Sequence, residues 1–293
     1  MNFRHDERAR GYARQAYSTL EPLHLVAYFG PQVGAVAKAE GLGFYPSYVG
    51  LRGAPLGACS PAVVTGAFYN WNPEVIESGW RTALETHSPA QLLDARERIA
   101  DQALTGAFGE LLGSDQLPRV VDRLNAILAK GAKSGRPLGA ANLGLERNLE
   151  PHVALWQATA TWREWRGDGH IAALVTNGLP AVEALVFHES EHPDPSIKGS
   201  GMGRAGTQKS RSWTDEQWAA GADALRSRGL LEPDAERLTA AGADLHKLIE
   251  DQTDDAAASI WAGVDDADEL FAAVRPFVKA VIDAGLLPGT TKK

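Results

Sequence analysis

The stretch 156–170, WQATATWREWRGDGH, contains two arginines, two acidic residues, a histidine and three tryptophans, and is the most informative part of the sequence. Arg163 and Arg166 lie nearly one helical turn apart, so their guanidinium groups could bind one carboxylate or phosphate together. Asp168 could orient His170 as a general base, or it could neutralise Arg166. An ionic network that only fixes a helix turn between two lobes is the structural alternative, and both interpretations stay open at this stage.

Three residues from the first part of the chain extend this candidate site. His24 lies between apolar residues in EPLHLVAYFG, which is the usual setting of a core histidine. Alternatively, His24 and His170 face one another across an interface between two lobes, with Arg52 and Tyr69 nearby. The predicted pocket for a small anionic ligand consists of His24, Arg52, Tyr69, Arg163, Arg166, Asp168 and His170. None of these residues is assigned a catalytic role.

Helices are predicted along nearly the whole chain, so the fold class is mainly α. The expected helices are 6–20, 31–41, 61–70, 73–84, 89–112, 116–133, 137–144, 152–166, 170–176, 180–188, 214–228, 238–250, 254–261 and 266–285. Gly167 and Gly169 are expected to end the helix at 152–166. Thr214 and Gln217 have the spacing of a capping box. Short strands are expected at 25–29 and around 229–238, and a mobile loop at 189–212.

A weak internal repeat predicts the domain organisation. Residues 51–70 resemble 165–189, because both begin with an Arg-Gly turn and close a helix on an aromatic pair. Residues 88–104 similarly parallel 238–257, and the two matches come in the same order. The predicted division is an N-terminal unit at 1–115, a helical connector at 116–149, a second unit at 150–265 and a C-terminal helix and tail at 266–293.

The second unit resembles a MarR-like winged helix. RSWTDEQWAAGADALRSRGLLE (211–232) resembles the recognition helix of that family and its Leu-x-x-x-Gly-Leu exit. LTAAGADLHKLIED (238–251) resembles the Leu-Thr-x-x-Gly start of the following helix, with a short wing at 232–236 between them. The resemblance implies tandem winged-helix-like units with small β-wings, joined by helices. It also implies DNA as a partner of the second unit.

The full chain also resembles an actinobacterial helix-turn-helix family of unsettled activity. The motifs that carry this resemblance are EPLHLVAYF (21–29), RGAPLG (52–57), AFYNWNP (67–73), REWRGDGH (163–170) and IEDQTD (249–254). This resemblance implies a fold and no particular reaction.

The expected DNA-binding residues are Lys209, Arg211, Thr214 and Gln217. The start of the expected recognition helix departs from the usual pattern, however, because Asp215 and Glu216 would repel phosphates. The wing likewise has Arg237 as its one cation beside Glu232, Asp234 and Glu236.

Other motifs predict no metal or cofactor. The residues His188, Glu189, Glu191, His192 and Asp194 are spaced as H-E-x-E-H, without the context of a zinc protease, and are interpreted as a solvated helix end. The glycines of GSGMGRAG (199–206) follow no strand and precede no G-K-[ST], so they are interpreted as a linker. Cys59 is the single cysteine and is interpreted as a small buried hydrophobe.

A net charge of −8 gives the chain no general attraction to nucleic acid. Without a signal peptide or membrane span, the sequence predicts a cytoplasmic protein with no membrane partner. Two functions are considered. One is a dimeric, ligand-responsive MarR-like transcriptional regulator, with its effector between the lobes. The other is a winged-helix scaffold that acts as an enzyme or binding protein for a small anionic metabolite.

Overall fold

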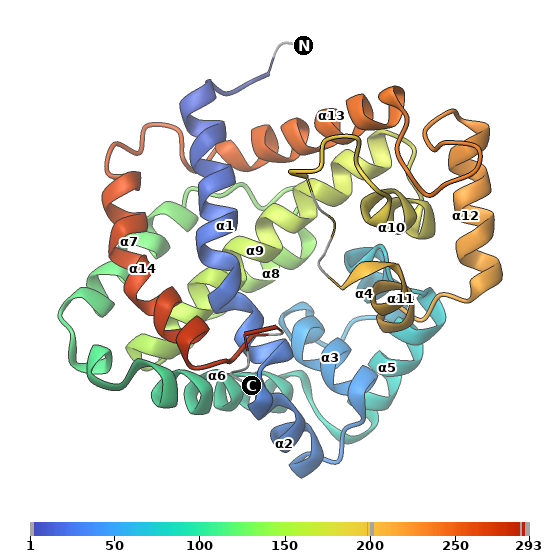
Figure 1. The fold of residues 1–293 in the computed structure, drawn as a ribbon. Coiled ribbons are helices and arrows are strands. Elements are labelled where there is room, and N and C mark those ends of the chain that lie inside the picture. The colour runs from blue at the N-terminus through green and yellow to red at the C-terminus, as the bar shows by residue number, and fades with distance from the viewer. Residues whose placement is uncertain (1–2, 198, 200–201, 288, 291–293) are drawn as a thin grey trace. The chain divides into compact units, whose positions relative to one another are not determined.

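A computed structural model describes the chain except for residues 1–2, 198, 200–201, 288 and 291–293 (Figure 1). Its α-helices are α1 (Glu7–Phe29), α2 (Pro31–Ala39), α3 (Phe44–Gly53), α4 (Pro61–Phe68), α5 (Pro73–Thr86), α6 (Pro89–Phe108), α7 (Gln116–Leu128), α8 (Pro137–Leu143), α9 (Pro151–Thr176), α10 (Ala181–Glu189), α11 (Gly203–Ser210), α12 (Asp215–Ser227), α13 (Ala240–Ala258) and α14 (Ala267–Asp283). Short 3₁₀ helices η1 (Ala54–Leu56) and η2 (Gly109–Gly113) follow α3 and α6. The mainly α class is confirmed.

The chain forms two compact units, each assembled from separate segments. Unit 1 contains Met1–Ser60, Gly79–Gly169 and Asp254–Lys293, and unit 2 contains Pro61–Ser78 and His170–Thr253. The helices α5, α9 and α13 each contribute residues to both units. Each unit is built from segments that alternate along the chain, whereas the four expected domains are continuous ranges of sequence. The two divisions are therefore not directly comparable, and the four domains stay a prediction.

The centre of unit 1 is the first part of α9. Trp156, Trp162 and Trp165 are each at most 2% exposed, and nearly every residue from 152 to 169 is buried or half-buried. Figure 1 shows α1 beside this helix, and the Trp156 indole N–H donates a hydrogen bond to the carbonyl of His24 on α1. A helix covered on all sides needs apolar residues all round. The aromatic density of 156–165 is therefore explained by burial at the centre of a helical unit.

The expected end of this helix at Gly167 and Gly169 is wrong, because α9 continues to Thr176. A Cβ atom on Gly169 would lie 2.2 Å from a guanidinium nitrogen of Arg136. That guanidinium donates a hydrogen bond of 2.6 Å to the carbonyl of Trp165. Gly169 therefore makes room for Arg136, and the following helix expected at 170–176 is the end of α9.

The strand expected at 25–29 is also wrong, because α1 passes through Pro22 and ends at Phe29. Leu20, Leu23, Val26 and Ala27 are at most 1% exposed, and their spacing of three and four residues is that of one buried helical face. The helix α3 was missing from the sequence prediction. Its proline, at position 46, lies in the first turn, where the absent backbone N–H does not interrupt the helix.

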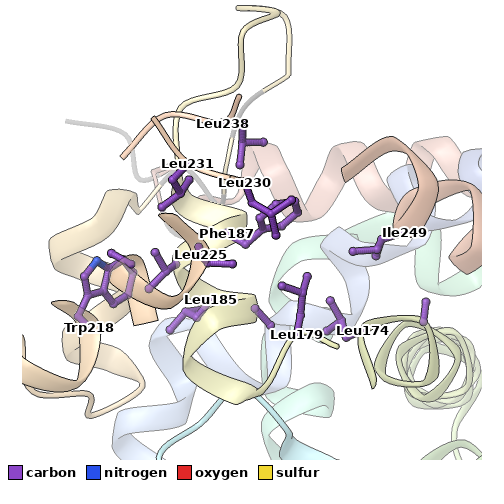
Figure 2. Packing of buried hydrophobic residues seen from close by; sticks show 14 residues of the cluster. Leu174, Leu179, Leu185, Phe187, Trp218, Leu225, Leu230, Leu231, Leu238 and Ile249 are labelled. Carbon is purple, nitrogen blue, oxygen red and sulfur yellow. The ribbon is translucent and has the colours of Figure 1, made fainter. Parts of the chain in front are cut away.

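The core of unit 2 joins α10 and α12. On α12 the buried residues Trp218, Ala222 and Leu225 share one face, since they recur at intervals of three and four. Figure 2 shows Leu185 and Phe187 of α10 among the side chains of this cluster, with leucines that follow α12. This packing fixes the orientation of α12 within unit 2 and leaves its other face in solvent.

The mobile loop expected at 189–212 is wrong in part, because residues 203–210 form α11. Residues 198 and 200–201 of that stretch lie outside the described residues. Within the described residues, β-type pairing is limited to two isolated bridges, Glu191 with Arg237 and Leu231 with Leu238. The small β-wings expected in both units are therefore not formed as strands in the described part of the chain.

None of the described helices is by itself both long enough and apolar enough to cross a bilayer; the bent pair α9 and α10 meets the length and composition criteria only when the two are taken together.

Candidate functional site

Two consecutive helices of unit 2, α11 and α12, are joined by residues 211–214. Thr214 is the N-cap of α12, and its hydroxyl accepts a hydrogen bond from the backbone N–H of Gln217. The Gln217 side chain accepts in return from the N–H of Thr214, so the predicted capping box is confirmed. A two-helix element with a turn of this length is the basic DNA-reading motif of helix-turn-helix proteins.

The exposed face of α12 carries no positive charge at its start. Asp215, Glu216, Gln217 and Asp223 are exposed, and small alanines lie between them. The Gln217 amide oxygen and the Thr214 hydroxyl are already engaged in the cap. These two hydrogen bonds fix the positions of both side chains at the start of the helix.

Most cations of unit 2 already have carboxylate partners. Each of these pairs has an N···O distance between 2.5 and 3.7 Å: Arg204 with Glu236, Arg226 with Asp223, Arg228 with Glu183, Arg237 with Glu191, and Lys247 with Asp251. Lys209 is exposed at the end of α11, and the Arg211 guanidinium lies 4.2 Å from the centroid of the Trp71 ring. Lys209 and Arg211 are two of the predicted DNA-binding residues. In the sequence they are the cations nearest to the turn at 211–214.

Three of the predicted ligand residues, His24, Arg52 and Arg163, lie around a buried carboxylate in unit 1. Glu164 of α9 is 2% exposed and receives two hydrogen bonds from Arg52 of α3, at 2.6 and 2.8 Å. Arg163 pairs with Glu21 of α1 at 3.0 Å. Burial raises the pKa of Glu164, but the charges of Arg52 and Arg163 outweigh burial and hold this pKa at about 2.

His24 belongs to the same cluster and is 5% exposed. Burial lowers the pKa of His24 to about 4, so its imidazole is neutral at pH 7. The ring packs against Tyr28, with 5.0 Å between the centroids, and Nδ1 has no hydrogen-bond partner among the described residues. A neutral imidazole beside two arginines that already bind carboxylates gives no cationic site for an anion.

Arg166 makes a separate ionic group with α1 and α13. Its guanidinium lies 3.2 Å from Asp254, which also binds Arg14 at 2.7 Å. The same guanidinium stacks 4.2 Å from the ring centroid of Tyr17. Arg163 and Arg166 therefore bind different carboxylates, and the structure does not show them sharing one anion.

Asp168 contacts α8 rather than His170. Its carboxylate accepts a hydrogen bond of 2.7 Å from the buried N–H of Gly139. A Cβ on Gly139 would lie 2.5 Å from Cα of Trp165, so the glycine permits this close approach of α8 to α9. Burial raises the pKa of Asp168 to about 6, although the Gly139 hydrogen bond opposes the shift.

We expect Asp168→Asn to stabilise the protein at pH 7.5. Since the pKa of Asp168 is about 6 in the folded state and ordinarily 3.8, folding favours its protonated form. The stabilisation from Asp168 is therefore fully present below pH 3.8 and is lost as the pH rises through 6. The asparagine still accepts from Gly139 and carries no charge, so the free energy of unfolding should rise by up to about 3 kcal/mol. Urea unfolding at pH 4 and pH 7.5 measures this, and an equal effect at both pH values would contradict it.

Tyr69 and His170 belong to unit 2 and have separate contacts there. The Tyr69 hydroxyl donates to the carbonyl of Leu179, and its φ of 41° is unusual for a residue with a side chain. His170 Nδ1 lies 2.9 Å from the hydroxyl of Thr253. A pocket that combines these two residues with the cluster of unit 1 stays a prediction.

A cavity of about 340 Å³ lies in unit 2, where no ligand was expected. Its lining includes the H-E-x-E-H residues of 188–192, which were interpreted as a solvated helix end. Leu238 and His246 complete the lining from a later part of the chain. The sequence shows the histidine spacing, but it cannot show that Leu238 and His246 lie beside those histidines in a cavity.

One of three comparisons with known proteins identified a family. A model of a helix-turn-helix family matches residues 13–288. Comparison with curated proteins and with solved structures gave no match. The match runs across both units and includes α11, α12 and the turn between them. Because it covers nearly all of the sequence, the chain belongs to this helix-turn-helix family.

Proposed function

We propose that the protein is a transcriptional regulator that binds duplex DNA through α11 and α12. The observation that carries this proposal is the order of elements in unit 2. Helix α10 precedes the Glu191 bridge residue, α11 and α12 follow, and the Leu231–Leu238 bridge then leads to α13. Three helices followed by a short β-paired arm are the order of a MarR-like winged helix, in which α12 is the recognition helix.

The charges of unit 2 restrict how this unit can bind DNA. The sequence of unit 2 contains eight Lys and Arg against fifteen Asp and Glu, a net charge of −7. General attraction to phosphate is therefore absent, and binding must rest on few phosphate contacts and on the shape and bases of one site. Lys209 and Arg211 supply the phosphate contacts in this proposal, and Thr214 and Gln217 act by holding the start of α12.

The regulator proposal includes a small-molecule effector and a homodimer, since paired half-sites require two recognition helices. The alternative, a scaffold that binds a small anionic metabolite through arginines, has less support. Arg52, Arg163 and Arg166 each bind a carboxylate of the protein itself. The structural interpretation of this cluster, as a network that fixes α9, explains every one of those contacts.

The expected result is selective binding with a weak dependence on salt. Fluorescence anisotropy with a labelled duplex from upstream of the protein's own gene should show binding at 0.15 M salt, whereas a scrambled duplex should not bind. A plot of log K against log salt should have a slope of about −2 per chain, since each phosphate contact contributes about −0.9. Lys209→Gln should reduce this slope by about one contact.

Lys247→Gln is the matched control, because Lys247 is exposed on α13 and pairs with Asp251 in the next turn. It should leave affinity and slope unchanged. Failure of the upstream duplex to bind at any salt concentration, with the folded protein present, would overturn the regulator proposal. A slope unchanged by Lys209→Gln would remove Lys209 from the interface.

A further inference from the structure

The segment that joins α4 to α5 in unit 2 contacts the turn between α11 and α12. The backbone N–H of Asn72 donates to the carbonyl of Arg211 at 3.1 Å, and the Asn72 side-chain amide donates to the carbonyl of Ser212 at 2.9 Å. In the opposite direction, the indole N–H of Trp213 donates to the carbonyl of Asn70 at 3.0 Å. These hydrogen bonds connect the segment to three successive residues of the turn.

This contact is shielded from water. Asn72 is 7% exposed and Trp71 is 2% exposed. The Arg211 guanidinium stacks on the Trp71 ring, as described above. A buried hydrogen bond is costly to break, because solvent does not replace the lost partner. Residues 69–72, named the brace from here on, therefore hold the turn firmly within unit 2.

Backbone strain is concentrated in the same place. Tyr69, with a φ of 41°, and Ser212, with a φ of 58°, are the described residues other than glycine that have a positive φ. Such conformations are unfavourable for residues with a side chain, and they persist only where the surrounding contacts fix them. Tyr69 begins the brace, and Ser212 belongs to the turn that the brace holds. Strain of this kind clusters at sites whose exact geometry serves a function.

We propose that the brace is part of the DNA-binding element and that Asn72 is a positioning residue for α12. The turn leads directly into α12, so the position of the turn sets where the first residues of this helix lie. A recognition helix contacts DNA through those first residues, and they need rigid support to do so. The inference rests on the proposed function. It adds that α12 is oriented by a residue 140 positions before Ser212 in the sequence.

Asn72 also has a local role, which the test must separate from this one. Its Oδ1 accepts a hydrogen bond of 3.0 Å from the N–H of Glu74, so Asn72 caps the start of α5. A serine at this position can still cap the helix and is uncharged, but it has no amide to donate to Ser212. Asn72→Ser therefore removes the bond to the turn and keeps the cap, whereas Asn72→Ala removes both.

The test combines DNA binding with hydrogen exchange of the full-length protein. In fluorescence anisotropy with the upstream duplex, Asn72→Ser and Asn72→Ala should each bind about tenfold more weakly than the original protein, the factor expected for one lost buried hydrogen bond. Without DNA, the amides of 211–213 should exchange about tenfold faster in both variants. The amides of 75–76, which donate to the carbonyl of Asn72, should exchange faster in Asn72→Ala only.

Asn177→Ala is the matched control. Asn177 also belongs to unit 2, and its side-chain amide donates to the carbonyl of Ala173 at 2.8 Å and to the side chain of Gln252 at 2.6 Å. Neither partner lies in the turn. Asn177→Ala should therefore bind the duplex like the original protein and should leave the exchange of 211–213 unchanged.

Trp213→Phe covers the case in which both substitutions at position 72 fail to fold. It keeps an aromatic ring and removes the donor to Asn70, so it should weaken binding by about the same factor. Full affinity of the folded Asn72→Ser variant for the duplex, or an equal loss of affinity in Asn177→Ala, would overturn the positioning role. Absence of binding by the original protein would instead overturn the regulator proposal, and with it any role of the brace in DNA binding. The exchange of 211–213 would then still show whether the brace holds the turn.

Discussion

Glu164→Ala is expected to lower the free energy of unfolding by about 3–5 kcal/mol, as measured by urea titration at pH 7. The substitution removes a carboxylate that accepts two hydrogen bonds from the Arg52 guanidinium, and the Arg52 side chain is 13% exposed. An uncompensated charge in that position has lost both its ionic partner and its water. The expected loss is therefore larger than that from removing an exposed ion pair, which is typically below about 1 kcal/mol.

The matched control removes both charges at once. Arg52→Met combined with Glu164→Leu leaves no unpaired charge and keeps much of the buried volume, so it should cost far less than Glu164→Ala alone. Arg226→Ala, which removes one member of the exposed pair with Asp223, should cost less than about 1 kcal/mol. If the double variant were as unstable as Glu164→Ala, the loss would come from missing hydrogen bonds or packing and not from an unpaired charge, which would contradict the prediction.

The same residue makes acid sensitivity predictable. The pKa of Glu164 is held at about 2 in the folded protein and is ordinarily 4.5. Its contribution to stability is therefore fully present above pH 4.5 and is lost as the pH falls through 2. The Asp168 carboxyl acts in the opposite direction, since its pKa is raised. Glu164→Gln should thus reduce the loss of stability between pH 4.5 and pH 2. Asp168→Asn should leave that loss unchanged and should instead remove the fall in the free energy of unfolding between pH 4 and pH 6.

Local sequence patterns predicted those features that depend on neighbouring residues. The capping box of Thr214 and Gln217 is such a feature, because its two hydrogen bonds lie within one helical turn. The helix at 152–166 was predicted from propensity, but its expected end depended on glycines at 167 and 169. Gly169 is required by Arg136, which is 33 positions earlier in the sequence. Its role in tertiary packing therefore could not be inferred from the local pattern.

In the candidate site too, features set by neighbouring residues were predicted, and contacts between residues distant in the sequence were not. The pattern in 211–251 identified α12 and the start of α13 because caps and exit leucines are close in sequence. The ionic cluster was detected as unusual composition, but its partners Glu21 and Asp254 lie far along the chain from α9. The cavity beside His188 and His192 is also lined by Leu238 and His246, which are distant in the sequence, so the spacing of the first two histidines alone indicated only a helix end.

Gly242→Ala is expected to be the most damaging small substitution in unit 2. A Cβ on Gly242 would lie 2.2 Å from the carbonyl oxygen of Leu230, an atom of the backbone that cannot rotate away. The same oxygen accepts the N–H of Thr239, and the Thr239 hydroxyl donates to Gly229 and accepts from the N–H of Gly242. These contacts explain why the RGLL…LTAAG pattern has a threonine and a glycine at these two positions. We expect a loss of about 3 kcal/mol, at the upper end of the usual cost of overpacking.

Gly11→Ala provides the matched control for this substitution. Gly11 is exposed in the interior of α1, and an added Cβ would meet nothing within 4 Å. Alanine there should stabilise the protein by about 0.5–1 kcal/mol, because it favours the helix over the unfolded chain.

Hydrogen exchange should show faster exchange at residues 230–239 in Gly242→Ala and not in Gly11→Ala. Because those residues hold the bridge beside α12, Gly242→Ala should also abolish binding of the upstream duplex while the helices of unit 1 keep their protection. The two alanine substitutions should therefore change the free energy of unfolding in opposite directions; if the two variants were equally stable and bound DNA equally, the close approach of α13 to Leu230 would have no energetic role.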